Sequence, residues 1–244
     1  GMKILLTNDD GVHAPGLEVL EEIALVEWQQ PLGRVKRIPN GIDTKGFVAK
    51  PRPDALRGVI KHEGEKWVGS LAGLRAVKNQ TALVRAVARL PEEWHLVIVG
   101  DGPERDAIRD AAEAADIAHR VHLPGFVAKP KTFLGLFDIF ALSSRSEQFP
   151  LSVVEAMAAG LPVAAPAVGD IAAMVAEENA PFIVRPNDQD ALSQALLTLA
   201  ADADRRQTIG QANRAKARAQ FDEAKMIATY RRLYASALGG GALD

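Results

Sequence analysis

Arg75 and Lys78 lie three residues apart in the stretch VGSLAGLRAVKN, directly after a short apolar run. A guanidinium can hold two phosphate oxygens at once and an ammonium acts as a compact positive charge, so this pair is suited to a diphosphate. Asn79, the next residue, is expected to cap the helix that follows. Taken alone, Arg75 and Lys78 could equally be ordinary surface charges.

Glu147 and Glu155 are two carboxylates eight residues apart in SEQFPLSVVEAMAAG. We expect Glu147 in a polar loop and Glu155 on the second turn of a helix that starts near Pro150. The N-terminal amides of a helix attract anions, and carboxylates accept hydrogen bonds from hydroxyls. The arrangement favours a ligand with phosphates and hydroxyls, such as a nucleotide sugar. In isolation, solvated carboxylates at a helix end would explain the same pattern.

Asp9 and Asp10 stand side by side in TNDDG, on a turn after an apolar run. Adjacent carboxylates suit a divalent cation such as Mg²⁺ or Mn²⁺, and a metal-dependent phosphatase is therefore an alternative function. Two carboxylates alone give such a cation too few ligands, and the five histidines show no ligand spacing. Adventitious cation binding and a simple Asx-type turn both remain open.

Short apolar runs alternate with longer helical patterns from Trp67 onward. The expected strands are Trp67 to Leu71, His95 to Val99, Val121 to Leu123, Asp138 to Leu142, Pro162 to Ala165 and Pro181 to Val184. The expected helices are Asn79 to Leu90, Glu104 to Ala115, Thr132 to Phe137, Leu151 to Ala159, Ile171 to Glu177, Asp188 to Ala201, Asp202 to Phe221 and Asp222 to Ala237.

Strands separated by helical crossovers pair in parallel, so the pattern predicts an α/β fold with a doubly wound, mainly parallel, Rossmann-like sheet. Ligands bind such sheets beyond the carboxyl ends of the strands, where we expect the loops of Arg75 and Glu147 to share one crevice. The stretch from Glu27 to Lys66 is interpreted as a connecting region, with a strand-like run at Arg34 to Ile38 and a turn at Pro39 to Asp43.

The composition restricts the classes of partner. With 29 basic and 31 acidic residues the net charge is −2, which gives no overall attraction to nucleic acid. The most apolar window, Leu151 to Val175, contains charges and a Gly-Leu-Pro break, so we expect no membrane span and a cytoplasmic location. The basic residues Arg205, Arg206, Arg214, Lys216 and Arg218 are expected to form a solvated helix face, with peripheral membrane association as the alternative.

The ordered motifs from about Arg34 to Tyr234, including RIPNGID at Arg37 to Asp43, resemble the C-terminal, donor-binding domain of retaining glycosyltransferases of the GT-B fold, family 4. The resemblance implies a single GT-B half-domain. It also implies that Arg75 and Lys78 hold the donor diphosphate and stabilise it as the leaving group, because these enzymes lack an obvious protein nucleophile.

The same resemblance assigns the remaining donor contacts. Glu147 and Glu155 match the Glu-x7-Glu pair, so Glu147 would contact the hydroxyls of the transferred sugar, and Glu155 the ribose. The backbone of Phe149, Pro150 and Leu151 would lie along the sugar and phosphates. Gly125, Phe126 and Val127 would lie near the base of a UDP, GDP or ADP sugar. Gln148 departs from the glycine that is usual in the family.

Residues 2–24, MKILLTNDDGVHAPGLEVLEEIA, resemble the first strand, metal-binding turn and first helix of SurE-type survival nucleotidases. We therefore interpret residues 1–27 as a SurE-like β-α segment added to a glycosyltransferase domain at 28–244, the two packed as one globular unit. About 33 residues precede the Arg34 boundary, fewer than the acceptor domain of family members needs. We expect a nucleotide-sugar-binding domain that does not complete transfer alone; a chimeric scaffold without catalysis and a SurE-like nucleotidase are the alternatives.

Overall fold

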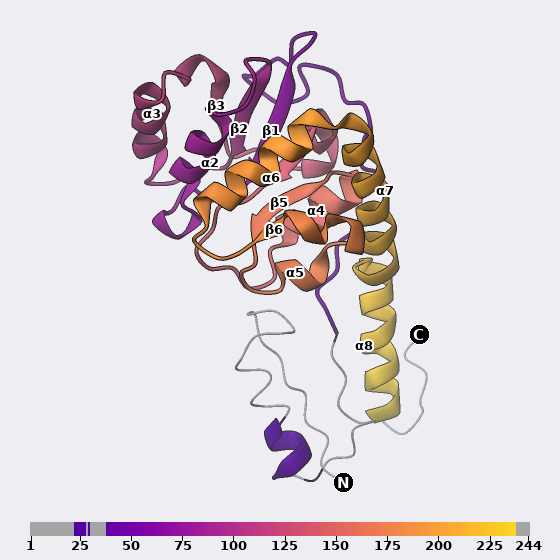
Figure 1. Cartoon of the computed structure of the whole chain (residues 1–244). Coiled ribbons are helices and arrows are strands. Elements are labelled where there is room, and N and C mark those ends of the chain that lie inside the picture. Colours follow the sequence, from indigo (N-terminus) through magenta and orange to yellow (C-terminus); the bar gives the residue numbers. More distant parts are fainter. Residues whose placement is uncertain (1–21, 28, 30–37, 238–244) are drawn as a thin grey trace.

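A computed structural model describes residues 22–27, 29 and 38–237 of the chain. Its core is one six-stranded sheet with the order β3-β2-β1-β4-β5-β6, in which every pair of neighbours is parallel (Figure 1). The strands are β1 (Lys66–Leu71), β2 (Trp94–Val99), β3 (Val121–Gly125), β4 (Ile139–Ala141), β5 (Val163–Pro166) and β6 (Ile183–Val184). The predicted doubly wound, Rossmann-like α/β fold is confirmed.

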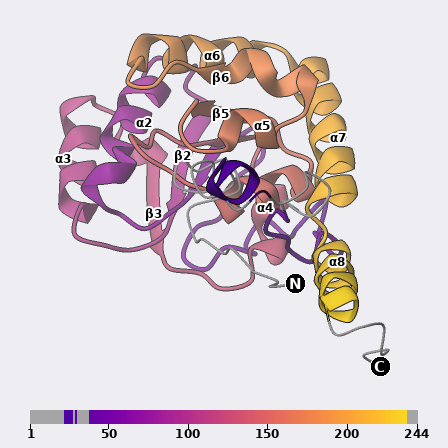
Figure 2. The same ribbon diagram turned by 90° about the horizontal axis from the view of Figure 1, so that it is seen from below.

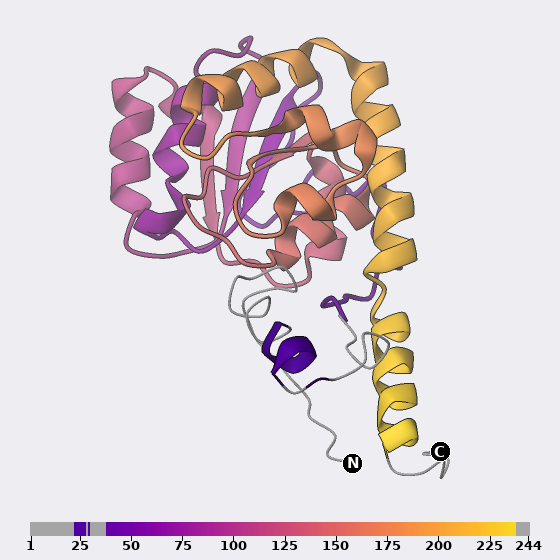
Figure 3. The ribbon, with the colours of Figure 1, turned by 60° about the horizontal axis from the view of Figure 1, so that its bottom comes forward.

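Helices cover both faces of the sheet. The α-helices are α2 (Gln80–Val87), α3 (Arg105–Ala114), α4 (Leu151–Ala159), α5 (Ile171–Met174), α6 (Gln189–Ala201), α7 (Ala203–Gln220) and α8 (Glu223–Ala237). Short 3₁₀ turns are η2 (Ala76–Lys78), η3 (Ala118–Arg120), η4 (Pro130–Thr132), η5 (Leu134–Leu136) and η6 (Glu177–Phe182). The view from below shows α2 and α3 at the left, α6 across the top and α7 at the right (Figure 2), while α8 projects away from the sheet (Figure 3).

Strand β2 shows how the sequence pattern divides the core. Leu96 and Ile98 point into the apolar cluster beneath α2, α3 and α6, whereas Val97 and Val99 point into the cluster beneath α4 and α5. All four side chains are buried, because a strand covered on both faces alternates between two apolar layers. The continuous apolar run HLVIV is therefore a central strand.

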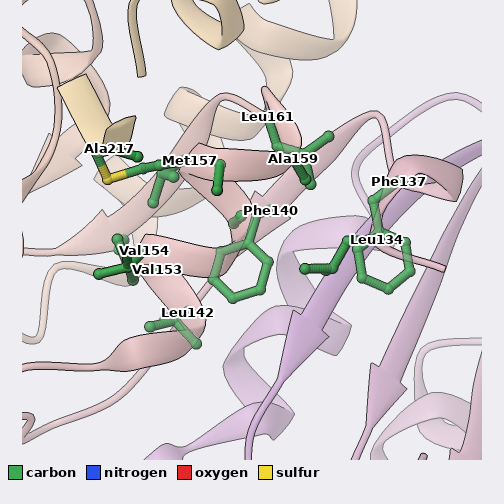
Figure 4. Close-up of a cluster of buried hydrophobic side chains, with 14 of the residues drawn as sticks. Leu134, Phe137, Phe140, Leu142, Val153, Val154, Met157, Ala159, Leu161 and Ala217 are labelled. Atoms are coloured by element: carbon green, nitrogen blue, oxygen red, sulfur yellow. The ribbon is translucent and has the colours of Figure 1, made fainter. Parts of the chain in front are cut away.

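The cluster beneath α4 is the one next to the loops that matter below. Figure 4 shows Phe140 and Leu142 facing Val153 of α4, with Met157 beside Ala217 of α7. These side chains are at most 2% exposed. Burial of these apolar side chains removes them from water, and this fixes α4, and hence its N-terminus, against the end of β4.

The predicted helix from Thr132 to Phe137 is wrong, because the structure has the two 3₁₀ turns η4 and η5 there. The side chains of Phe133, Leu134 and Phe137 are all buried, so the segment is packed from several sides at once. A Cβ at Gly135 would lie 2.2 Å from the carbonyl oxygen of Val48, so the connecting segment crosses directly over the backbone at that point. Helix α5 also ends at Met174, earlier than the predicted Glu177.

The prediction of a solvated basic face on α7 is also wrong for three of its five residues. Arg206 donates to the carbonyl oxygens of Leu199 and Ala200, at the end of α6. Arg214 and Lys216 likewise donate to carbonyls at the ends of α4 and α5. The last carbonyls of a helix lack intrahelical partners, so these basic side chains satisfy the ends of three neighbouring helices. Sequence alone does not distinguish a capping cation from a solvated one.

The described part of the connecting region is irregular, as predicted, but the expected turn at Pro39 to Asp43 is replaced by a single parallel bridge between Ile42 and Asp222. Residues 1–21 of the predicted N-terminal β-α unit lie outside the described residues. Residues 34–37 of the predicted strand-like run also lie outside them. Within the described residues, no helix has both the length and the apolar character needed to cross a bilayer.

Candidate functional site

The strand order reverses between β1 and β4, because the chain moves from β1 towards β3 on one side and from β4 towards β6 on the other. Open α/β sheets bind ligands at such a switch point, and we use the word crevice for the region beside the two loops that leave the carboxyl ends of β1 and β4. The loop after β1 carries Arg75 and Lys78, and the loop after β4 carries Glu147. The two loops are in direct contact, as the sequence predicts.

Lys78 and Glu147 are in contact across the crevice. The Nζ of Lys78 lies 2.6 Å from the Oε1 of Glu147, although the two residues are 69 positions apart in the sequence. The hydroxyl of Ser144 donates to the same Oε1, also at 2.6 Å. The carboxylate side chain is only 8% exposed, so this charge is held by two donors away from bulk water.

Backbone and hydroxyl contacts tie the same two loops together. The Oγ of Ser143 lies 2.9 Å from the carbonyl oxygens of both Lys78 and Asn79. The amide of Arg145 donates to the carbonyl of Val77 at 2.8 Å. Asn79 occupies the N-cap position of α2 in the left-handed conformation, with φ of 51°, and its side chain makes no capping hydrogen bond. The predicted side-chain cap is therefore wrong, and Asn79 instead forms the tight bend between η2 and α2.

Arg75 is exposed, and its side chain forms no hydrogen bond or ion pair within the described part of the chain. Its loop is supported from below by Gln80, whose Nε2 donates to the carbonyl of Gly73 at 2.9 Å. Gln80 is 2% exposed and is the first residue of α2. Sequence reasoning missed Gln80, and the available signal was a polar residue at the first position of a helix whose other residues are mostly apolar.

The N-terminus of α4 opens the crevice on the β4 side. Pro150 stands at its N-cap position and makes no capping hydrogen bond with its own side chain. Phe149 is buried with its ring edge-on to Phe221, the ring centroids being 5.6 Å apart, whereas Leu151 is 44% exposed. The amides of the first turn of α4 carry the positive end of the helix dipole, which favours an anion there.

Glu155 lies one turn further along α4 and is half-buried. Burial raises its pKa to about 7, and the nearby positive charge of Lys131 opposes the rise. Lys131 is itself paired with Asp43 of the connecting region. Within the described residues, Glu155 forms no ion pair with Lys78. The cation near Glu155 is Lys131, which the sequence motifs did not single out.

The segment predicted to lie near a nucleotide base ends β3. Gly125 is the last residue of that strand, and its carbonyl accepts from the amide of Gly100 at 3.0 Å. Phe126 projects outward and is 79% exposed, while Val127 packs against the core beneath α4. An exposed aromatic ring at the carboxyl edge of the sheet is available to contact a planar ligand.

The predicted cation ligands Asp9 and Asp10 lie outside the described residues. Among residues 22–27, 29 and 38–237, no group of three or more His, Asp or Glu side chains is arranged to hold a metal ion. The metal site therefore stays a prediction, separate from the crevice.

A family model described as "Glycosyl transferases group 1" matches residues 52–216, a range that contains both crevice loops. The chain belongs to this family. The predicted glycosyltransferase membership is thereby confirmed, and the group 1 match includes every crevice residue predicted from sequence.

Several characterised proteins resemble this group 1 domain. The N-acetyl-alpha-D-glucosaminyl L-malate synthase of Bacillus anthracis is 25% identical over 210 residues, which are 85% of this chain and 55% of that protein. Sucrose-phosphate synthase from Thermosynechococcus elongatus is 27% identical with a TM-score of 0.74, covering 91% of this chain and 57% of that one. Anabaena HepE in complex with UDP is 25% identical with a TM-score of 0.77, covering 88% and 61%. The chain spans about half the length of the curated relatives it matches.

Proposed function

We propose that the crevice between the β1 and β4 loops binds the nucleoside-diphosphate sugar that serves as donor for a group 1 glycosyltransferase. The observation that carries this proposal is the 2.6 Å contact between Lys78 and Glu147. It brings together a cation suited to a diphosphate and a carboxylate suited to sugar hydroxyls. A single ligand that spans both groups must carry negative charge and hydroxyls side by side, as a nucleotide sugar does.

The diphosphate lies on the β1 side in this proposal. Arg75 offers a guanidinium fork that has no partner among the residues the structure describes, and the ammonium of Lys78 has three hydrogens, of which Glu147 needs one. The first amides of α4 face the same anion from the β4 side. The ligand is thus held by charges on two loops and one helix end.

The hydroxyl groups of the ligand are assigned to the two carboxylates. Glu147 accepts from the transferred sugar, and Glu155 accepts from the ribose. The backbone of Phe149, Pro150 and Leu151 runs along the sugar and phosphates. The base lies against residues 125–127, beside the exposed ring of Phe126. Two structures support a nucleotide sugar as the ligand class, since Anabaena HepE is described in complex with UDP and with UDP-glucose.

The reaction that follows is transfer with retention. The bond between the sugar C1 and the phosphate oxygen breaks, and the acceptor oxygen bonds to C1 on the same face. The acceptor proton passes to the departing diphosphate. Negative charge grows on that leaving group in the transition state, so Arg75 and Lys78 lower the barrier by preorganised electrostatic stabilisation.

Calorimetric titration of the full chain with UDP, GDP and ADP tests the proposal. Binding is measured rather than turnover, because transfer also needs an acceptor held in near-attack geometry. Arg75→Ala and Lys78→Met should each weaken nucleotide binding by about 10- to 100-fold, the effect of losing a charge-assisted hydrogen bond. Glu155→Gln should weaken it more than Asp10→Asn does.

Arg109→Ala is the matched control, because Arg109 is an exposed arginine within α3 and belongs to neither crevice loop. Its affinity should equal that of the unsubstituted chain. Absence of binding heat with all three nucleotides for a folded sample contradicts the proposal. An equal loss in Arg109→Ala and Arg75→Ala would show that the effect is non-specific charge.

A further inference from the structure

Ser143 and Ser144 follow β4 and stand between the two loops of the crevice. They are 6% and 2% exposed, and buried hydroxyls require hydrogen-bond partners. Ser143 reaches across to the backbone of Lys78 and Asn79, whereas Ser144 reaches forward to the side chain of Glu147. The adjacent serines therefore bond to opposite sides of the same crevice.

The direction of these hydrogen bonds is fixed by chemistry. Carbonyl oxygens and an ionised carboxylate only accept, so each serine uses its single hydroxyl hydrogen as a donor. Ser144 and Lys78 both donate to the Oε1 of Glu147. No described residue donates to the other oxygen, Oε2. Glu147 consequently has one oxygen held by two donors and one that accepts no hydrogen bond from a described residue.

We propose that Ser144 is a positioning residue that holds Oε2 of Glu147 towards the sugar of the donor, while Ser143 sets the distance between that carboxylate and the Lys78 loop. The proposal rests on the proposed function, since it names how one site residue is oriented. Lys78 alone cannot fix the carboxylate, because a flexible ammonium follows its partner through several rotamers. A short hydroxyl three residues away in the same loop restricts the carboxylate to one orientation.

A ligand-independent experiment tests the positioning itself. Crystal structures of the unliganded full chain are compared for the unsubstituted protein, Ser144→Ala and Ser144→Thr. The carboxylate of Glu147 should occupy one position in the first, more than one in Ser144→Ala, and one again in Ser144→Thr. Ser144 lines a small hollow with Pro166 and Val184, and the threonine variant keeps the hydroxyl while it adds one methyl group. A single unchanged carboxylate position in Ser144→Ala overturns the proposal.

A binding experiment tests its consequence. Affinities for UDP and UDP-glucose are measured by calorimetry for the same proteins and for Ser146→Ala, an exposed serine of the same loop. The ratio of the UDP-glucose affinity to the UDP affinity should fall about fivefold in Ser144→Ala, the effect of one hydrogen bond. Ser144→Thr should restore the ratio, Ser146→Ala should keep it, and UDP affinity should change little in all of them.

The outcomes separate the two proposals. Failure of the unsubstituted chain to bind either nucleotide contradicts the proposed function, and the crystal comparison still decides whether Ser144 orients Glu147. Binding of both nucleotides with an unchanged ratio in Ser144→Ala overturns the positioning role alone. A parallel loss of both affinities, with a lower melting temperature, would show that Ser144 is merely structural.

Discussion

Glu155→Gln is expected to make the fold more stable while it weakens nucleotide binding. The substitution keeps the size of the side chain and removes its ability to ionise. Burial raises the pKa of Glu155 to about 7, against an ordinary value of 4.5. A carboxylate that ionises reluctantly destabilises the folded state, so the neutral amide should relieve that destabilisation.

The sign of the effect depends on pH. Below pH 4.5 the carboxyl is protonated in both folded and unfolded chains, and Glu155 contributes no pH-dependent destabilisation. Between 4.5 and about 7 the unfolded chain loses its proton and the folded chain keeps it, so the free energy of unfolding falls as the pH rises. Above about 7 the folded carboxyl is also ionised and the destabilisation is complete.

The size of the effect follows from the same shift. A rise from 4.5 to about 7 corresponds to at most about 3 kcal/mol. Glu155 is only half-buried, so solvent screening reduces the expected value to about 1–2 kcal/mol. For a domain of this size that is a rise in melting temperature of about 2–8 °C in Glu155→Gln at pH 8.5, and almost none at pH 4.5.

Urea unfolding of both proteins at pH 4.5, 7 and 8.5 measures this difference. Glu113→Gln, at an exposed position on α3, is the control and should stay within about 0.5 kcal/mol at every pH. Lys131→Met should make the parent chain less stable at pH 8.5, because Lys131 opposes the rise in the pKa of Glu155. A difference between Glu155→Gln and the parent that does not grow with pH would refute the reasoning.

Three further predictions concern the supports of the fold and the site. Gly169→Ala should lower stability by about 1–3 kcal/mol, since residue 169 has φ of +56° and a Cβ would lie 2.3 Å from the carbonyl oxygen of Gln148; an unchanged urea midpoint would contradict this. Burial lowers the pKa of His95 and His122 below the ordinary value of 6.5. The free energy of unfolding should therefore fall as the pH drops below 6.5, because the unfolded chain binds protons first. Urea titrations should show a smaller fall in His122→Gln than in the parent chain, and an equal fall would count against this reasoning. Asn213→Ala should lower the free energy of unfolding by about 2–4 kcal/mol, because a buried amide with three hydrogen-bond partners is removed; a thermal melt within 1 °C of the parent would disagree.

Secondary structure was predictable where the apolar period was strong. Helix α4 was predicted from Leu151 to Ala159, and these are its observed limits. The run of mostly apolar residues stops at Gly160, which adopts the left-handed conformation that commonly ends a helix. The apolar segment from Thr132 to Phe137 shows the reverse. Its composition suits a helix, but close packing against the connecting region imposes 3₁₀ turns.

The strand order lay beyond the sequence pattern. Alternating strands and helices require a parallel sheet, but they do not state that β1 pairs with β4. That single pairing creates the switch point and brings Lys78 to Glu147. The motifs identified the residue types, and the family resemblance implied their roles. The direct contact between Lys78 and Glu147 could be seen only in the fold.

Residues that act through other residues were the hardest to predict. Ser143, Ser144 and Gln80 have no chemistry of their own that a spacing argument detects. Their partners are backbone carbonyls and a carboxylate, which become neighbours only after folding. Lys131 was missed for a related reason, since its relevance comes from its distance to Glu155 and not from any motif around it.

A crystal structure of the chain soaked with UDP tests the central claim most directly. The account predicts that the diphosphate lies between Arg75, Lys78 and the N-terminus of α4, with the ribose hydroxyls at Glu155. A nucleotide bound elsewhere on the molecule, with the ion pair of Lys78 and Glu147 facing an empty crevice, would contradict it.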